Sequence, residues 1–205
     1  MKTTILPTAS SQALSSALHL LNQGRLIAFP TDTVYGLAAL ISDASAIERL
    51  YSAKERSPIK AIAVLIGDIN QLDLVADSMP PIALRLAERF WPGALTLVVP
   101  RRLDLPANLS PDLSIGIRMP DHAFARELMR AAGPLATTSA NLTGGPNPRD
   151  AQEVLAQLEG RVELVLDGGP ATGGIPSTVV GCMGLELTIF RQGAISAEQI
   201  FSVLN

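Results

Sequence analysis

The sequence predicts an α/β protein, with a single-domain, twisted, open mixed sheet, flanking helices and a substrate cleft at the strand ends. Three observations support this prediction. Helical patterns alternate with short apolar runs along the chain. Runs such as AIAVLI (61–66) and VELVL (162–166) are almost continuously apolar, which is typical of strands covered by helices. No stretch has the composition of an interdomain linker, so residues 1–205 are expected to form one domain.

Local signals define the expected elements of the first half of the chain. Apolar residues at helical spacing predict a first helix, which Gly24 ends. Ser45 and Glu48 have the spacing of a capping box, and the pair Pro80–Pro81 opens a later helix. The expected elements are helix 12–23, strand 25–29, helix 45–54, strand 61–66, helix 80–90, strand 94–99 and strand 114–119.

The second half continues the alternation. Asp121 is the expected cap of a helix that Gly133 ends, and Asp150 caps the next helix. Ser196 and Gln199 have capping-box spacing at the last helix. The expected elements are helix 121–132, strand 135–138, a helix from 150, strand 162–166, a glycine-rich loop 167–176, strands near 177–180 and 186–191, and a helix from 196.

Composition narrows the classes of protein. The net charge of −3 argues against a broad nucleic-acid-binding face. The single cysteine, Cys182, excludes an internal disulfide and is typical of a reducing cytosol. The longest apolar run, 61–66, is far too short to span a bilayer, and the first ten residues lack a signal peptide's apolar segment. We therefore expect a soluble cytoplasmic protein with no membrane contact.

Small polar residues gather where strands are expected to end. The string LATTSANLTGGPNP (135–148) combines a strand with a dense set of hydroxyl and amide groups. TDTVYGL (31–37) and SIGIRMP (114–120) are two further segments of this kind. In open α/β sheets, ligands bind in the crevice beyond the strand ends, so these segments together predict one cleft. Each of them alone could also be an ordinary turn.

Basic residues suggest the charge of the ligand. Lys54, Arg56 and Lys60 fall within KERSPIK (54–60), where they could hold a polyphosphate; capping of the helix dipole is the alternative. The loop DGGPATGGIPS (167–177) matches neither standard phosphate-binding motif, and no G-x-S-x-G or zinc motif is present. The remaining chemistry is electrostatic: two charged substrates are held together while charge at a phosphorus is stabilised.

Several motifs, taken in order, resemble the YrdC domain family. They are FPTDTVYGLAA, the K-x-R of Lys54 and Arg56, FWPGALTLVV, IGIRMPDH, TTSANLTGGPNP, and STVV followed by IFRQG, and they extend from about residue 10 to 200. The resemblance implies a YrdC-like fold, in the short form without an additional C-terminal domain. It also implies a nucleotidyltransferase, threonylcarbamoyl-AMP synthase, which joins L-threonine, bicarbonate and ATP and releases pyrophosphate. The product serves the threonylcarbamoyladenosine modification of tRNA.

The resemblance assigns roles to individual residues. Arg118 would receive the carboxylate of threonine through its planar fork, and Mg²⁺ is expected with the phosphates, although no residue is expected to bind metal. Four residues are expected to be catalytic through positioning and electrostatics: Lys54, Arg56, Ser139 and Asn141. The expected ATP-binding residues are Lys54, Arg56, Lys60, Ser114, Ser139, Asn141, Asn147 and Arg191, and the threonine-binding residues are Thr33, Arg118, Thr137 and Ser177.

Two positions depart from the family pattern, and other interpretations stay open. Leu65 stands where many relatives have a histidine, and Gly181 replaces an aspartate. The chain could be a sibling without the activity, or a YrdC-like module that binds tRNA or double-stranded RNA without synthase activity. As a synthase, it would supply downstream proteins that transfer threonylcarbamoyl to tRNA, with a weak tRNA contact among the expectations. Replacing Lys54 or Arg56 should change stability by about 0.5 kcal/mol or less if both are exposed.

Overall fold

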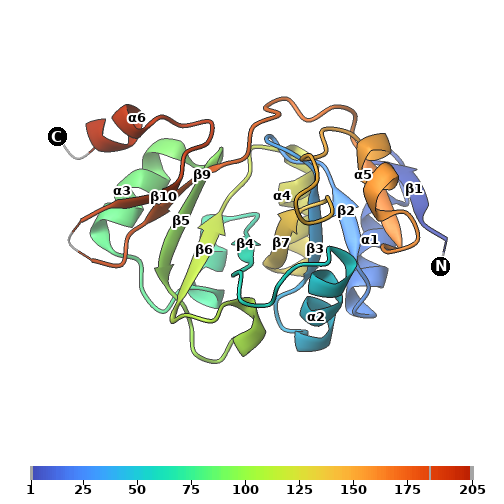
Figure 1. Cartoon of the computed structure of the whole chain (residues 1–205), viewed down its shortest axis with the longest axis horizontal. Coiled ribbons are helices and arrows are strands. Elements are labelled where there is room, and N and C mark those ends of the chain that lie inside the picture. Colours follow the sequence, from blue (N-terminus) through green and yellow to red (C-terminus); the bar gives the residue numbers. More distant parts are fainter. Residues whose placement is uncertain (1, 185, 204–205) are drawn as a thin grey trace.

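A ten-stranded mixed sheet forms the centre of the protein. The computed structural model describes residues 2–184 and 186–203. The strand order is β1-β8-β2-β3-β7-β4-β6-β5-β9-β10, so the N-terminal and C-terminal strands lie at opposite edges (Figure 1). The strands are β1 (Thr4–Pro7), β2 (Ile27–Phe29), β3 (Gly36–Leu40), β4 (Ala63–Leu65), β5 (Leu95–Pro100), β6 (Ser114–Arg118), β7 (Leu135–Ser139), β8 (Leu164–Asp167), β9 (Thr178–Gly181) and β10 (Thr188–Arg191).

The pairing confirms the predicted mixed sheet. Parallel pairs join β1 to β8, β8 to β2, β4 to β6 and β5 to β9. Antiparallel pairs join β2 to β3, β3 to β7, β7 to β4, β6 to β5 and β9 to β10. The three-residue strand β4 is the link between β7 and β6, and thus between the two halves of the sheet.

Helices cover both faces of the sheet around β2. Ile27 and Phe29 belong to the smaller core cluster with α1 and α4, whereas Ala28 belongs to the larger cluster with α2, α3 and α5. Successive strand side chains point to opposite faces, which places these clusters on the two sides of the sheet. The helices are α1 (Ala13–Asn22), α2 (Ala44–Ala53), α3 (Pro81–Phe90), α4 (Ala123–Ala132), α5 (Ala151–Leu158) and α6 (Ala197–Ser202).

Most predicted helix boundaries are confirmed, and two predicted caps are wrong. Asp150 accepts from the Glu153 amide, and the Ser196–Gln199 capping box forms. The Ser45–Glu48 box does not, because the chain becomes helical one residue before Ser45 and Asp43 accepts from the Ala46 amide. Likewise His122, not Asp121, caps α4. In both cases another side-chain acceptor near the predicted cap has the N-cap position.

The sequence prediction missed two strands and two short helices. Strand β3 carries no β-branched residue and follows TDTVY, which suggested a loop. Strand β1 is an edge strand whose side chains are mostly exposed, so its hydrophobic pattern is weak. The short 3₁₀ helices are η1 (Ile69–Leu74) and η2 (Ala107–Leu109). Within the described ranges, no helix is both long enough and apolar enough to cross a membrane.

Candidate active site

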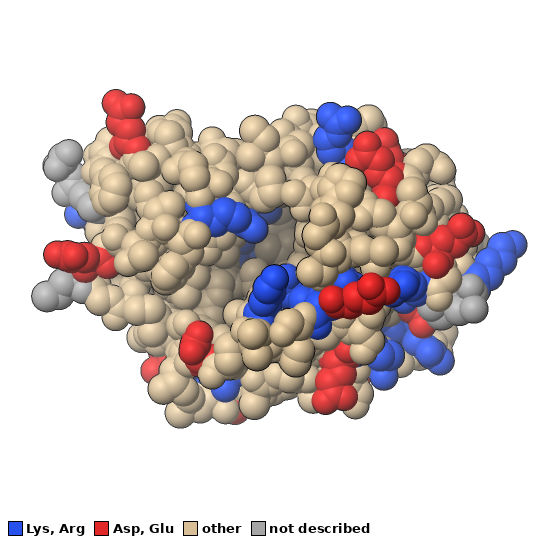
Figure 2. Space-filling view, viewed as in Figure 1, with Lys and Arg blue, Asp and Glu red and all other residues tan. Residues whose placement is uncertain are grey.

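A cleft of about 430 Å³ opens between the two halves of the sheet. Figure 2 shows the hollow near the middle of this face, with basic side chains on two of its sides. Its lining combines residues of β3, β4 and β7 with residues of β5, β6, β9 and β10. Of the predicted site residues, those that line it are Thr33, Arg56, Ser114, Arg118, Thr137, Ser139, Asn147, Ser177 and Arg191.

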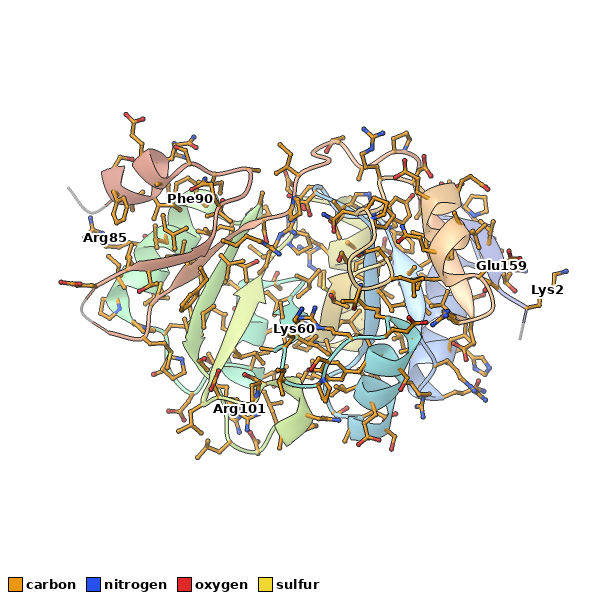
Figure 3. The ribbon with its side chains drawn as sticks, viewed as in Figure 1. Lys2, Lys60, Arg85, Phe90, Arg101 and Glu159 are labelled. Carbon is orange, nitrogen blue, oxygen red and sulfur yellow. The ribbon has the colours of Figure 1, made fainter. Side chains whose placement is uncertain are left out.

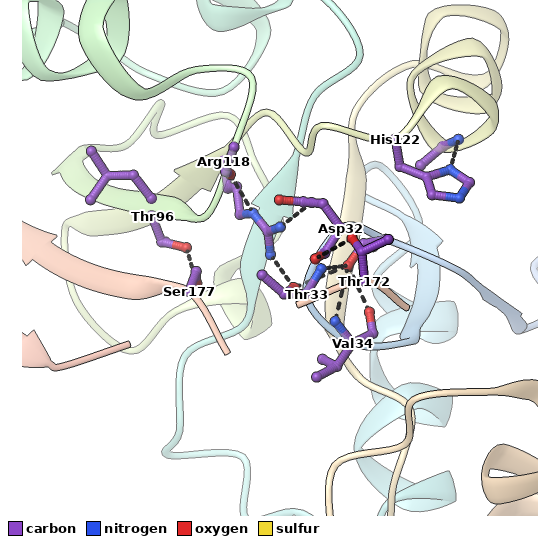
Figure 4. Close-up of polar contacts among 12 residues, drawn as sticks. Asp32, Thr33, Val34, Thr96, Arg118, His122, Thr172 and Ser177 are labelled. Carbon is purple, nitrogen blue, oxygen red and sulfur yellow. Dashed lines mark hydrogen bonds and ion pairs between the residues drawn. The ribbon is translucent and has the colours of Figure 1, made fainter. Parts of the chain in front are cut away.

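Arg118, at the end of β6, is held at the cleft by three partners (Figure 4). Its Nε donates to the Gly93 carbonyl at 2.9 Å, and its Nη1 donates to Thr33 Oγ1 at 2.8 Å. Its Nη2 forms a buried ion pair with Asp32. A guanidinium has five N–H donors, so one donor on each Nη nitrogen is left for a ligand. The nearest acid in sequence, Asp121, is not the partner that the structure gives Arg118.

Positive charge is concentrated at the cleft. Burial lowers the pKa of Arg191, and the charge of Arg56 lowers it further. Burial also lowers the pKa of Arg118; the Asp32 carboxylate opposes this shift, whereas Arg191 adds to it. Cationic side chains that share one cleft repel one another unless an anion binds between them. Among the described lining residues Asp112 is the one acid, so the cleft is suited to an anionic ligand.

Arg191, at the end of β10, and Ser177, directly before β9, form the opposite wall. Arg191 Nη2 donates to the Ser177 carbonyl at 2.9 Å and to Ser177 Oγ at 3.1 Å. Ser177 Oγ also lies 2.8 Å from the hydroxyl of Thr96 on β5. These contacts fix the arginine and leave part of its guanidinium to the cleft, as expected of an anion-binding group.

Lys54 lies behind the cleft wall rather than in it. The residue is 2% exposed and is not part of the cleft lining. Its Nζ donates to the carbonyl oxygens of Ser139 and Asn141 and, at 3.3 Å, to Asn141 Oδ1. Burial and the charge of Arg56 lower the pKa of Lys54 to about 7. The expectation that Lys54 is exposed is therefore wrong, and we expect its replacement to destabilise the fold, because three buried acceptors depend on this amine.

The loop after β7 is built on Lys54. The Thr143 amide donates to the Lys54 carbonyl at 2.9 Å, and Asn141 Nδ2 donates to the carbonyls of Leu142 and Gly145. Asn141 is buried and, like Lys54, does not line the cleft. The K-x-R and S-x-N motifs thus meet in space, but Lys54 and Asn141 bond one another while Arg56 and Ser139 face the cavity.

Lys60 is also outside the cleft lining. It is exposed on the loop between α2 and β4, near the middle of the view in Figure 3. Its carbonyl accepts from the Tyr51 hydroxyl at 3.0 Å and from Arg56 Nε at 3.4 Å. Arg56 also donates to the Ala61 carbonyl at 2.8 Å, so this loop orients the arginine through its backbone.

Sequence reasoning missed several lining residues and one residue that acts behind them. Thr96 bridges β5 to Ser177, and Phe190 precedes the predicted Arg191. Asp32 lies inside the TDT string, where a carboxylate next to the predicted Thr33 was the available signal. Of the two departures, Leu65 lines the cleft and Gly181 does not.

No metal-binding cluster accompanies the cleft. Across residues 2–184 and 186–203, no group of three or more His, Cys, Asp or Glu side chains is placed to hold a metal ion. Mg²⁺ is commonly bound through substrate phosphates and water with only one or two carboxylates.

The chain is similar to known proteins in sequence and in fold. The family model Sua5_yciO_yrdC, described as Telomere recombination, matches residues 19–193. The chain belongs to the Sua5/YciO/YrdC family. Threonylcarbamoyl-AMP synthase of Bacillus subtilis (strain 168) is 42% identical over 198 residues, which are 94% of this chain and 56% of the relative. This Sua5/YciO/YrdC chain thus spans little more than half the length of that relative.

Two further relatives of this Sua5/YciO/YrdC chain agree with the assignment. A protein from Mycobacterium tuberculosis (strain ATCC 25618 / H37Rv) is 39% identical over 200 residues, which are 97% of this chain and 92% of the relative. The crystal structure of P. abyssi Sua5 complexed with L-threonine has a TM-score of 0.94 at 34% identity, covering 98% of this chain and 61% of that one. The predicted YrdC-like fold is confirmed.

Proposed function

We propose that this protein is an L-threonylcarbamoyl-AMP synthase. The reaction converts L-threonine, bicarbonate and ATP into threonylcarbamoyl-adenylate, pyrophosphate and water. The observation that carries the proposal is the cleft itself, in which Arg56, Arg118 and Arg191 face one cavity with Asp112 as the one described acid of its lining. The similarity to the threonylcarbamoyl-AMP synthase of Bacillus subtilis supports the same activity.

Arg118 would bind the carboxylate of threonine. Its two unused N–H donors and the neighbouring Thr33 hydroxyl offer a carboxylate the planar, two-point contact that arginine makes best. Thr137 and Ser177 lie on the cleft lining and would complete the amino-acid end. The similarity to P. abyssi Sua5, whose structure is a complex with L-threonine, supports an amino-acid pocket in this fold.

Arg56 and Arg191 would hold the phosphates of ATP. Ser114, Ser139 and Asn147 add neutral donors to the same lining. Lys54 and Asn141 lie behind the cleft lining and would act by holding the loop that presents Ser139. Lys60 would assist through the carbonyl that orients Arg56. Mg²⁺ enters only as the counter-ion of the phosphates.

The chemistry would proceed through a carbamate. The neutral amine of threonine captures carbon dioxide derived from bicarbonate, and its nitrogen loses a proton to water. The carbamate oxygen attacks the α-phosphorus, the bond from the α-phosphorus to the bridging oxygen breaks, and pyrophosphate leaves. The arginines stabilise the charge on the phosphates in a preorganised site. The product would be passed to proteins that transfer threonylcarbamoyl to tRNA.

The test is pyrophosphate release by purified protein. Release should require ATP, threonine and bicarbonate together, and Arg56→Ala should reduce it steeply. Arg102→Ala, which removes an exposed ion pair with Asp104 outside the cleft, is the matched control and should retain full activity. Equal release without threonine would disprove the proposal. The RNA-binding alternative gains no support from a net charge of −3 with acids and bases interspersed on the face in Figure 2.

A further inference from the structure

Phe190 is an aromatic side chain on the cleft lining that remains 63% exposed. It lies on the edge strand β10, directly before Arg191. Burying an exposed aromatic ring against a ligand is strongly favourable, and its π-face accepts a second planar ring. The neighbouring Arg191 and the facing Arg56 provide charge for an anion. A planar group and an anionic group on one ligand would therefore be accommodated side by side.

A β-bulge brings Arg191 to the same side of β10 as Phe190. Ile189 pairs with Val180 and Arg191 pairs with Val179, so Phe190 is the extra residue between two consecutive partners. In a regular strand, neighbouring side chains point to opposite faces, and Phe190 would point away from Arg191. Bulges re-aim side chains and are enriched next to active sites. Here both residues line the same cleft.

The ring of Phe190 packs directly against the backbone at Gly181. A Cβ atom at this position would lie 2.6 Å from Cε2 and 2.9 Å from Cζ of Phe190, which is closer than real contacts allow. The ring therefore rests on the backbone of β9 because residue 181 has no side chain. This explains in physical terms why a glycine follows TVV here, in place of the aspartate expected from the family pattern.

We propose that Phe190, seated on Gly181, is the platform on which the adenine ring of ATP stacks. The inference rests on the proposed function and goes further, because it assigns the base-recognition end of the cleft. Stacking involves the base and not the phosphates. A change at Phe190 should therefore alter the affinity for ATP without altering the affinity for a polyphosphate. Arg191, which follows it in the chain, would take the adjoining phosphates.

Calorimetric titration of the full chain with ATP and with inorganic tripolyphosphate tests the proposal. Phe190→Ala should weaken ATP binding about 5- to 150-fold, the range for loss of one base–aromatic stack. Tripolyphosphate, which has no base, should bind as it does to the wild type. Phe190→Trp should restore ATP affinity, and Gly181→Ala should weaken ATP alone by displacing the ring. Phe201→Ala, at a 44% exposed phenylalanine on α6 outside the cleft lining, is the matched control.

Several outcomes would overturn the inference. Unchanged ATP affinity in Phe190→Ala would show that the ring does not touch the base and would point to a protein-binding role of the exposed side chain. Equal loss of ATP and tripolyphosphate would show a general disturbance of the wall. The wild type could also bind ATP through Phe190 but release no pyrophosphate with threonine and bicarbonate. That result would support the stacking role of Phe190 and disprove the proposed reaction.

Discussion

The Asp32 carboxylate and the Arg118 guanidinium form a buried ion pair at the edge of the cleft. The same Asp32 accepts, through its backbone carbonyl, the amide of Gly173 at 3.0 Å and the hydroxyl of Thr172 at 3.4 Å. Asp32 thus joins the arginine to the glycine-rich loop 167–176. A Cβ atom at position 173 would lie 2.6 Å from the Asp32 oxygen, so glycine is needed for this approach.

Arg118→Lys should weaken threonine binding at least about tenfold, which corresponds to about 1.4 kcal/mol. A lysine keeps the charge, but it cannot bond Gly93, Thr33 and Asp32 while also presenting a planar fork. ATP binding measured without threonine should barely change. Calorimetry with each substrate separately, with Arg102→Lys as the exposed control, gives both affinities. Weakened ATP binding with intact threonine binding would move Arg118 to the phosphate site.

Lys54→Met should lower the free energy of unfolding by about 1–3 kcal/mol, because it leaves buried carbonyl acceptors without a donor. The methionine has nearly the same length, so the loss of packing is small. Arg56→Met should cost less, since this half-buried side chain bonds carbonyls at the cleft edge. Urea unfolding of the three proteins measures the difference. Equal stability of wild type and Lys54→Met would contradict the structural role.

Stability should depend on pH through Lys54. Its folded pKa of about 7 lies below the ordinary value of 10.5, so between these values the unfolded chain binds more protons. The free energy of unfolding contributed by this group therefore rises with pH above 7 and is constant below it. Relative to Lys54→Met, the wild type should gain about 2 kcal/mol between pH 7 and pH 9. Lys60→Met, on the exposed loop, is the control and should follow the wild-type pH profile.

The sequence predicted the fold where hydrophobic pattern and caps agree. Strands 61–66 and 162–166 have uninterrupted apolar runs, and their cores appear as β4 and β8. Strand β3 was missed because GLAAL has no strand propensity of its own and is stabilised by two antiparallel neighbours, β2 and β7. Strand β3 therefore forms because of its pairing with distant strands, which a local sequence pattern does not reveal.

Several residues that line the cleft were predicted from the sequence, but the role of the buried residues behind the lining was not. The polar segments at expected strand ends marked Thr33, Arg118 and Ser139 as parts of one cavity, and all three line the cleft, whereas Ser177 was assigned through the family resemblance. Sequence could not show that Lys54 turns inward, because its acceptors are backbone carbonyls 85 and 87 positions away. Nor could it show the bulge at Phe190, which depends on the register between two strands.

The position of Phe190 and Arg191 on an edge strand has a consequence for how the cleft opens. Strand β10 has four residues and pairs with β9 alone, while Arg118 lies on β6 between two partners. Elements with few partners exchange their backbone amide hydrogens through low-energy local opening. We therefore expect amide exchange in β10 to be faster than in β6. Fraying of this edge would dismantle the Phe190–Arg191 end of the cleft and leave the Arg118 end assembled.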